Sequence, residues 1–248
     1  MARPFTTLGD IGSDEAALVG GKAFNCARLM LAGIPVPEGV VITTAANETS
    51  LESSQLRDWL AALPAGILLA VRSSGVEEDS VADSFAGIHE TRLNVGPKDV
   101  PEAVRGCWAS AISPAALAYR RARHLTTENV RIAVLIQRMI QPIASGVAFT
   151  VNPISGRKDE LLINSVFGLG EALVSGQVEP DEFKIRKADC EVLTTHLAGK
   201  IPSLPNEQVQ ELSALLLRIE AHFGSAQDVE WCYDGRRLWI VQSRLVTS

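Results

Sequence analysis

Several features that would point to other classes of protein are missing from this chain. No apolar run approaches the roughly 18 residues that span a bilayer, and no apolar signal-peptide run follows the start Met1–Phe5. The four cysteines lie far apart without a C-x-x-C pair and the four histidines are scattered, so neither a zinc site nor a disulfide framework is indicated. The formal charge of -6 argues against a general nucleic-acid binder, which carries a basic face. We therefore expect reduced thiols, a cytoplasmic location, and neither a membrane nor a nucleic acid as partner.

The P-loop spacing G-x-x-x-x-G-K-[ST] is also absent, but four stretches carry the parts that a triphosphate site needs. Those parts are cations, a loop of small residues whose backbone N–H groups wrap phosphate, and oxygen ligands for a hard metal. In chain order the stretches are Gly20-Gly21-Lys22, Val71-Arg72-Ser73-Ser74, Ser84-Phe85-Ala86-Gly87, and Asp228-Val229-Glu230-Trp231 with Gln242-Ser243-Arg244. Together they predict one nucleotide site built from distant parts of the chain.

The length of the chain and its alternating helix and strand patterns restrict the fold classes it can adopt. The 248 residues suffice for one large domain or two lobes, and 46% hydrophobic with 21% charged residues is ordinary for a globular protein. Helix and strand patterns alternate in both halves, without an internal repeat or a low-complexity linker. We therefore predict an α+β fold with α/β alternation in two lobes, residues 1–136 and residues 137–248.

Apolar periodicity and turn residues place the individual elements. Helices are predicted over residues 23–32, 55–63, 100–112, 114–124 and 207–223, and strands over residues 39–44, 67–71, 92–95, 132–137, 147–151, 161–164, 183–186, 228–233 and 237–242. Gly33 is expected to end the first helix and Gly224 the last, which Asn206 is expected to cap. Pro114 suits the first turn of its helix.

The two N-terminal stretches each supply a cation. Gly20-Gly21-Lys22 precedes a predicted helix, where unpaired N–H groups and a lysine favour an anion, although a helix entry with a solvated lysine fits equally well. Arg72 follows a predicted buried strand, and its planar fork of donors suits phosphate oxygens. The alternative for Arg72 is a surface ion pair with a carboxylate of the following loop, Glu77, Glu78 or Asp79.

The predicted C-terminal hairpin carries two polar pairs. Asp228 and Glu230 share a face of one strand, and Gln242 and Arg244 share a face of the next. A two-residue turn at Asp234-Gly235 would send Gln242 to the opposite face, whereas a three-residue connection would put Asp228 opposite Gln242. We therefore predict an odd-length or bulged turn with all four side chains on one face. The alternative is an exposed polar face on an edge hairpin.

Once they share a face, Glu230 and Gln242 provide oxygen ligands for Mg²⁺, which keeps waters and phosphate oxygens besides. Arg244 would then clamp a phosphate. Asp228 would contact the nucleotide site or orient its neighbours. This hairpin is the most informative block of the sequence.

These stretches, together with the opening string Gly20-Gly21-Lys22-Ala23 to Gly33-Ile34-Pro35-Val36-Pro37-Glu38-Gly39, resemble a known domain. It is the ATP-binding domain of the phosphoenolpyruvate synthase and pyruvate phosphate dikinase family, which includes rifampicin phosphotransferase. The resemblance extends over residues 18–247. It implies an ATP-grasp-like arrangement with the nucleotide between the lobes, and ATP and Mg²⁺ as ligands.

The same resemblance assigns roles to residues. Lys22, Arg72 and Arg244 would act on the transferring phosphoryl groups, with Arg72 stabilising charge in the transition state. The triphosphate loop would comprise Ser84, Ala86, Gly87 and Thr91, and Ile88 stands where many relatives carry Gln. Gln137, Met139 and Ile140 would hold the adenine, where the alternative is a plain buried strand end. Glu171, in a glycine-rich block, would lie near the ribose or adenine.

The resemblance also implies the reaction. In the family, phosphate passes from ATP to a histidine on a separate swivelling domain, AMP is formed, and the β-phosphoryl group is retained by that histidine. No histidine of this chain, His89, His124, His196 or His222, lies in the family's Gly-rich Thr-Ser-His context. The chain is therefore expected to act on a histidine of another domain or a partner protein, as a stand-alone subunit or as a piece of a longer enzyme. A non-catalytic ATP-sensing module and a direct small-molecule kinase remain as alternatives.

Overall fold

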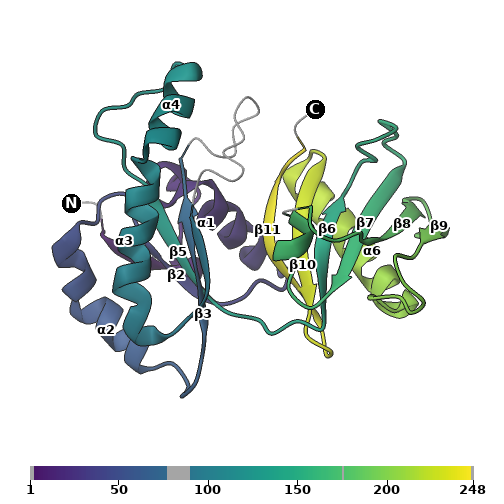
Figure 1. Cartoon of the computed structure of the whole chain (residues 1–248), viewed down its shortest axis with the longest axis horizontal. Helices are drawn as coiled ribbons and strands as arrows, with labels where there is room; N and C mark the ends of the chain where they lie inside the picture. Colours follow the sequence, from purple (N-terminus) through teal and green to yellow (C-terminus); the bar gives the residue numbers. More distant parts are fainter. Residues whose placement is uncertain (1–2, 77–89, 175, 247–248) are drawn as a thin grey trace. The chain divides into compact units, whose positions relative to one another are not determined.

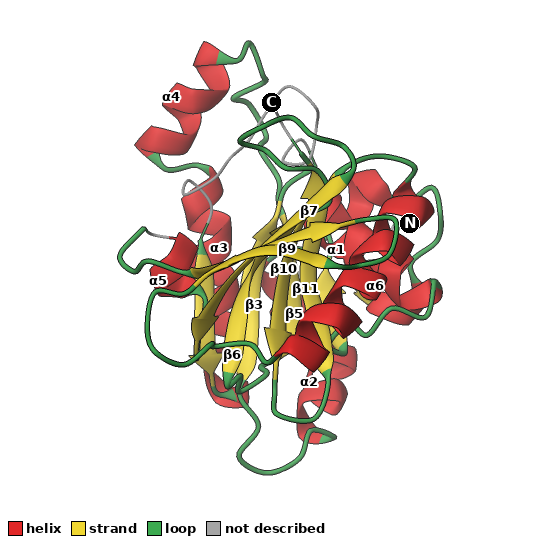
Figure 2. Cartoon of the chain, turned by 90° about the vertical axis from the view of Figure 1, so that its right-hand side faces the viewer, coloured by secondary structure: helices red, strands yellow, loops and turns green. Residues whose placement is uncertain are grey.

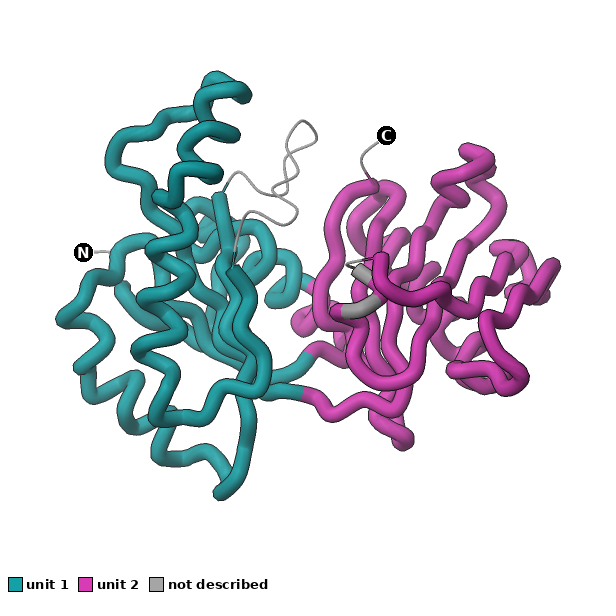
Figure 3. The backbone as a smooth tube through the Cα atoms, viewed as in Figure 1, with its two compact units in different colours: residues 1–28, 37–139 teal, residues 29–36, 140–248 magenta. Residues whose placement is uncertain are grey.

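A computed structural model describes residues 3–76, 90–174 and 176–246 (Figure 1). The described residues form a mixed fold of helices and strands, which confirms the predicted α+β class. They divide into two compact units (Figure 3): residues 1–28 with 37–139, and residues 29–36 with 140–248. The predicted lobe boundary lay between 136 and 137, and the prediction did not foresee that residues 29–36 group with the later unit.

The first unit contains a five-stranded antiparallel sheet in the order β1-β2-β5-β3-β4. Its strands are β1 (Phe5–Thr7), β2 (Gly39–Ile42), β5 (Ala133–Arg138), β3 (Leu69–Ser74) and β4 (Thr91–Val95). Its helices are α1 (Ala16–Leu31, whose last residues belong to the second unit), α2 (Ser54–Ala61), α3 (Val100–Ala111) and α4 (Pro114–Ala122), with short 3₁₀ helices η1 (Leu8–Asp10), η2 (Glu48–Glu52) and η3 (Pro97–Asp99). Val71, Val104, Cys107 and Ile136 belong to one buried cluster that joins α3 to the sheet. Burial of this apolar face is what holds α3 on the strands.

The start of α1 differs from the prediction. The helix begins at Ala16, not at residue 23, and a residue with non-helical dihedral angles, Gly20, kinks it. The end agrees with the prediction, because Gly33 has a φ of +70° and donates its N–H to the carbonyl of Met30. Glycine adopts this left-handed conformation at no steric cost, which makes it a common helix terminator.

The second unit contains a six-stranded antiparallel sheet in the order β11-β10-β6-β7-β8-β9. Its strands are β6 (Ala144–Phe149), β7 (Glu160–Phe167), β8 (Asp181–Arg186), β9 (Val192–His196), β10 (Gln227–Tyr233) and β11 (Leu238–Leu245), and its helices are α5 (Glu171–Val174) and α6 (Asn206–Phe223). Gly224 ends α6 in the left-handed conformation, as predicted. The predicted cap is wrong, because Pro205 occupies the cap position and Asn206 is the first helical residue.

The two faces of this sheet differ in burial. Along β8 and the first part of β10, fully buried residues alternate with partly exposed ones. The buried set includes Val229, Trp231 and Phe183, and it faces α6, which packs against β10 (Figure 2). The opposite face carries Glu230 and Asp228, and we call it the Glu230 face. A strand with this alternation buries one side only.

Two short strands were not predicted. β1 has three residues, too few to show a period. β9 has four exposed residues out of five and lies at the end of the sheet order, so no apolar alternation marks it. Within the described residues, no helix has the length and apolar character to cross a membrane.

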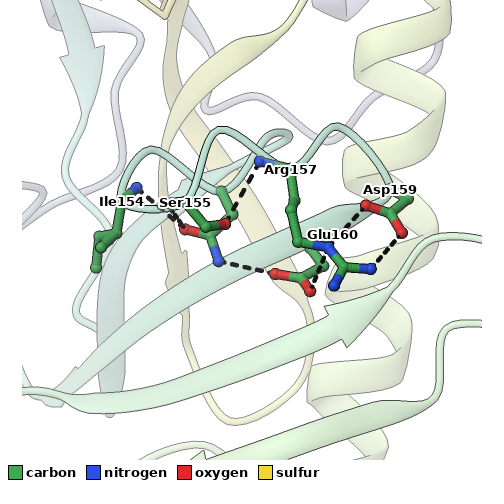
Figure 4. Close-up of polar contacts among 6 residues, drawn as sticks. Ile154, Ser155, Arg157, Asp159 and Glu160 are labelled. Carbon is green, nitrogen blue, oxygen red and sulfur yellow. Dashed lines mark hydrogen bonds and ion pairs between the residues drawn. The ribbon is translucent and has the colours of Figure 1, made fainter.

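The loop between β6 and β7 is held by polar contacts (Figure 4). The Asn152 side-chain oxygen accepts the backbone N–H groups of Ile154 (3.0 Å) and Ser155 (3.1 Å), and its amide donates to Glu160 at 2.8 Å. Arg157 pairs with the other oxygen of Glu160 at 3.0 Å. An Asn that folds back onto the following backbone replaces a regular turn, so this loop is fixed at its base.

Candidate functional site

The glycine-lysine stretch lies against the end of β3. Gly20 has a φ of +74°, and a Cβ atom there would lie 2.1 Å from the carbonyl oxygen of Ser74. The N–H of Gly21 donates to the carbonyl of Gly75 at 2.9 Å, and the N–H of Ala23 donates to Ser74 Oγ at 3.1 Å. Only glycine fits such an approach, so the structure joins two of the stretches identified in the sequence.

Two cations belong to this junction. Lys22 lies in the sequence between Gly21 and Ala23, whose N–H groups bind the end of β3. Arg72 shares a face of β3 with Ser74. Both side chains are largely buried, with 8% of Lys22 and 9% of Arg72 exposed. Lysine and arginine are rarely buried to this degree. Two largely buried cations beside a kinked glycine segment form an environment that favours a phosphate.

A bulge decides which residue of β4 lies beside Arg72. Leu69 pairs with Val95, but the register shifts before Val71, and Arg72 then lies opposite Thr91. Asn94 lies in this irregular stretch with a left-handed φ of +57°, a conformation typical of bulges. Without the shift, Arg72 would lie opposite Arg92 and Thr91 would point to the other face. The structure therefore places Thr91 directly opposite Arg72. The other predicted loop residues, Ser84, Ala86 and Gly87, lie outside the described residues.

Gln137 and Met139, which were predicted to hold the adenine, form hydrogen bonds within the first unit. Gln137 is buried and donates its side-chain amide to the carbonyl of Pro37 at 3.1 Å. The backbone N–H of Met139 donates to the carbonyl of Leu68 at 2.9 Å. That N–H therefore cannot also serve an adenine ring, and the contacts left to this segment are its carbonyls, its side chains and Ile140.

Ile140 begins the second unit in an apolar cluster with Cys232 and Trp239. This packing anchors the chain where it enters the second unit. Glu171 is exposed and opens α5. The loop before it is tied to β6, because Ser145 Oγ donates to the carbonyl of Gly168 at 2.5 Å. Sequence reasoning missed Ser145, since a lone serine in a strand has no distinguishing pattern.

The β10–β11 hairpin brings the four predicted side chains onto one face. Glu230 lies directly opposite Gln242, and Asp228 lies directly opposite Arg244. The connection from Tyr233 to Leu238 has an even number of residues, 234–237, so it alone would place Glu230 opposite Val241. A register shift between Glu230 and Trp231 corrects this. The predicted shared face is confirmed, but the predicted odd-length or bulged turn is wrong, because the turn has four residues and the register shift lies within β10. The predicted partner of Asp228 is wrong, because it faces Arg244 and not Gln242.

Asp228 and Arg244 form an ion pair, with Arg244 Nε 2.9 Å from Asp228 Oδ2. Burial raises the pKa of Asp228 above its ordinary value and the Glu230 carboxylate adds to the effect, while the Arg244 guanidinium opposes it. The other oxygen, Asp228 Oδ1, is buried and accepts no hydrogen bond from the residues that the structure describes. A buried acceptor without a donor is costly, and a cation nearby would offset that cost.

The donor set on this face suits magnesium. Glu230 and the 3% exposed Gln242 offer a carboxylate and an amide oxygen from directly opposed positions. Mg²⁺ prefers oxygen ligands and commonly uses one or two carboxylates, with waters and substrate phosphates completing the shell. In the described part of the chain no group of three or more His, Cys, Asp or Glu side chains is gathered for a metal. The pair therefore fits a metal that phosphate oxygens help to hold, not a closed structural site.

Each unit by itself carries groups that suit a phosphorylated nucleotide: largely buried cations in the first, and opposed oxygen ligands beside an arginine in the second. Residues 61–201 and 194–248 match the pyruvate phosphate dikinase AMP/ATP-binding domain. The chain belongs to this family, which confirms the resemblance found in the sequence.

Curated relatives agree with this membership. The chain is 33% identical to a probable phosphoenolpyruvate synthase of Archaeoglobus fulgidus over 315 residues, covering 99% of this chain and 42% of that protein. It is 34% identical to a rifampicin phosphotransferase of Streptomyces sp, covering 97% of this chain and 36% of that protein. It is 33% identical to the prodigiosin synthesizing transferase PigC of Serratia marcescens, covering 94% of this chain and 32% of that protein. The chain thus spans less than half the length of these relatives.

The first of these alignments is longer than the chain itself, 315 positions against 248 residues, so the relative carries additional residues inside the aligned region. Among solved structures, the chain is similar to an acetyl-coenzyme A synthetase of Ca. Korarchaeum cryptofilum, with a TM-score of 0.49, 13% identity and 89% of each chain covered. It is also similar to the D-alanine-D-alanine ligase of Helicobacter pylori, with a TM-score of 0.45, 12% identity, and 92% of this chain and 54% of that chain covered.

Proposed function

We propose that this chain binds Mg-ATP and acts as the ATP-dependent phosphotransferase part of a dikinase-type system. The acceptor is a histidine on another domain or protein. AMP is released, the β-phosphoryl group stays on that histidine, and the γ-phosphoryl group leaves to a further acceptor such as water. The proposal includes the cytoplasm as the location, since ATP and reduced cysteines are found there.

The observation that carries this proposal is the register of β10 and β11. It sets Glu230 opposite Gln242 and Asp228 opposite Arg244 on one face. A metal ligand pair and an adjacent guanidinium are the two groups that a Mg-triphosphate needs, because Glu230 and Gln242 would hold the metal and Arg244 suits bidentate binding of phosphate oxygens. An ordinary exposed hairpin has no need of Gln242 at 3% exposure or of an enclosed Asp228 oxygen.

The first unit supplies the remaining positive charge in this proposal. Lys22 and Arg72 neutralise phosphate oxygens, and Arg72 stabilises the charge that develops during transfer. Thr91, opposite Arg72, places a hydroxyl and a backbone N–H beside the same phosphates. Ser84, Ala86 and Gly87 complete the phosphate loop. Phosphoryl transfer depends on such positioning and charge stabilisation, and it needs no nucleophile from this chain.

The second unit holds the metal and the rest of the nucleotide. When bound, Mg²⁺ would be held by Glu230 and Gln242 and would neutralise phosphate charge. Arg244 clamps a phosphate, and Asp228 keeps the guanidinium in place through the 2.9 Å contact. The adenine lies against Gln137, Met139 and Ile140, and Glu171 lies near the ribose.

The carrier histidine comes from elsewhere. Among the described histidines, His196 is 3.3 Å from Glu179, and the His222 ring packs edge-on against Phe223. In neither pair is the partner a residue assigned to phosphate. The relatives named above are longer than this chain and are named as phosphoenolpyruvate synthase and rifampicin phosphotransferase.

Calorimetric titration with Mg-ATP tests the binding part of the proposal. The wild-type chain is expected to bind, and both Arg244→Ala and Glu230→Ala are expected to weaken binding at least tenfold. Circular dichroism checks that each variant is folded. Binding that survives both substitutions would show that the hairpin is not the triphosphate site. A folded wild-type chain that binds no Mg-ATP would refute the proposal for this chain.

Product analysis tests the reaction. Mg-ATP is incubated with the chain alone, with candidate small-molecule acceptors, and with a histidine-bearing domain of a longer relative. AMP that forms only with the histidine-bearing domain supports the proposal. ADP with a small acceptor alone would indicate a direct kinase, and binding without products under any condition would indicate a sensing module.

A further inference from the structure

Asn164, in the middle of β7, carries an enclosed polar atom without a partner. Its side-chain oxygen Oδ1 is buried and accepts no hydrogen bond within the described part of the protein. Leaving a buried acceptor unsatisfied is destabilising. Native structures contain few such groups, and each calls for a reason such as a missing ligand.

The strand register places Asn164 on the Glu230 face. Gln242 lies opposite Glu230, Glu230 opposite Val147, and Val147 opposite Asn164. Residues directly opposite each other point to the same side of a sheet, so these four form one row. Two strand spacings separate Glu230 from Asn164, which is about 10 Å. This separation is too large for both to ligate one Mg²⁺, and it is comparable with the distance from the terminal phosphates of a nucleotide to its sugar.

The neighbours of Asn164 in this row cannot satisfy it. Val147, on one side, is apolar. Glu182, on the other side, is 3.6 Å from Lys184 Nζ, and an ionised carboxylate has no hydrogen to donate. The position itself is fixed, because a Cβ on Gly146 would lie 1.8 Å from the backbone oxygen of Asn164 and 2.9 Å from Trp231. The amide is thus held in place facing a site that lacks a donor.

We propose that Asn164 forms a hydrogen bond with a ribose hydroxyl of the bound nucleotide and makes the site selective for ribonucleotides. This inference rests on the proposed function. A hydroxyl can donate and accept, so it suits either end of the amide, whereas phosphate oxygens have no hydrogen to give. Ser145, two residues before Val147 on the same strand, ties the loop before α5 to β6, and Glu171, which we propose for the ribose, begins that helix.

The test compares three nucleotides by calorimetric titration in the presence of Mg²⁺: ATP, 2′-deoxyATP and 3′-deoxyATP. The wild-type chain is expected to bind ATP about five- to tenfold more tightly than one of the two deoxy analogues, a typical net value for one hydrogen bond. In Asn164→Leu, which keeps the approximate size of the side chain, ATP is expected to bind as weakly as that analogue. Glu182→Leu, at the next residue in the row, gives Asn164 no hydrogen-bond donor. It serves as the matched control and is expected to keep the wild-type ratio.

Thermal unfolding separates this role from a structural one. Because Asn164→Leu removes an unsatisfied atom, it is expected to be at least as stable as the wild type while losing selectivity. If Asn164→Leu does not fold, Asn164→Asp replaces it in the test. This variant keeps the acceptor, so all three nucleotides are expected to bind more weakly while the wild-type ratio is retained.

The outcomes distinguish this inference from the proposed function. A wild-type chain that binds ATP and both analogues equally would overturn the role of Asn164 and leave the proposed function standing. The same holds if Asn164→Leu keeps the wild-type ratio, or if Asn164→Asp loses it. A wild-type chain that binds none of the three nucleotides would overturn both.

Discussion

The backbone of Gly20 lies so close to the carbonyl oxygen of Ser74 that a Cβ atom would be only 2.1 Å away from it. Real Cβ atoms do not approach a backbone oxygen to that distance, and both groups are part of rigid elements, α1 and β3. This contact sets Lys22 near the strand that carries Arg72. The glycine is therefore the structural condition for bringing the two cations into one part of the first unit.

We predict that Gly20→Ala destabilises the protein by roughly 3 kcal/mol or more, the range of substitutions that force backbone to move. The alanine would meet the Ser74 carbonyl and would also adopt the unfavourable φ of +74°. Gly66→Ala is the control, because Gly66 has a similar φ of +76° with no atom within 4 Å of the added Cβ. It should cost only the left-handed strain of about 1–2 kcal/mol. Denaturant unfolding of both variants measures the difference, and equal losses would refute a role for the close contact.

Much of this fold follows from local pattern. The predicted strands 161–164 and 183–186 correspond to β7 and β8, and the predicted helix 207–223 corresponds to α6, because each buries a continuous apolar face. Lys22, Arg72, Glu230 and Gln242 were identified by residue type and order. The shared face of Glu230 and Gln242 was predicted as well. The direct partner of Asp228 and the pairing of Arg72 with Thr91 could not be predicted, because they depend on single-residue register shifts.

One strand pair in each unit shows that such register shifts limit prediction from the sequence. In the second unit a shift between Glu230 and Trp231 decides that Gln242 shares a face with Glu230. In the first unit a shift between Leu69 and Val71 decides that Thr91 lies opposite Arg72. A slip of one residue reverses the face of every later side chain, and a bulge has no strong sequence signature. The unsatisfied oxygen of Asn164 is a property of packing alone and leaves no mark in the sequence.

The bulge in β4 can be tested at Asn94, whose φ is +57°. Asn94→Gly is expected to keep the fold, because glycine adopts the left-handed conformation readily. Asn94→Val is expected to destabilise the protein by about 1–2 kcal/mol, since a β-branched residue is strained there. Urea unfolding measures both. We also expect Asn94→Val to weaken Mg-ATP binding, because Thr91 would no longer be held opposite Arg72. Equal stability of the two variants would contradict the proposed strain at the bulge.

The cysteines provide a test that depends on pH. Burial raises the pKa of Cys107 to about 11 and that of Cys232 to about 12, whereas Cys190 is only partly buried. In the unfolded chain a cysteine titrates near 9.0. The stabilisation by the buried thiols is therefore fully present below about pH 9 and is lost as the pH rises toward 12.

Two measurements follow from this pH dependence. The free energy of unfolding should fall steadily between about pH 9 and pH 12, and Cys107→Ala should reduce the slope. At neutral pH a thiol reagent should label Cys190 in the native protein, and Cys190→Ser should abolish that labelling. All four cysteines should react after denaturation. Rapid native labelling of Cys107 or Cys232 would show that these thiols are not enclosed.

The last prediction concerns Glu230, which lies opposite Gln242 on the sheet. Glu230→Gln keeps the size of the side chain and removes the charge that Mg²⁺ prefers in its ligands. We expect wild-type affinity for ATP to fall at least tenfold when EDTA removes the metal, and the affinity of Glu230→Gln to be nearly the same with and without EDTA. Glu182→Gln, on the same face of the sheet but three strands away from Glu230 along the row through Val147 and Asn164, should behave like the wild type. If Glu230→Gln kept the full metal dependence, the metal would have to be held elsewhere, and the opposed Glu230 and Gln242 would then serve the fold and not the nucleotide.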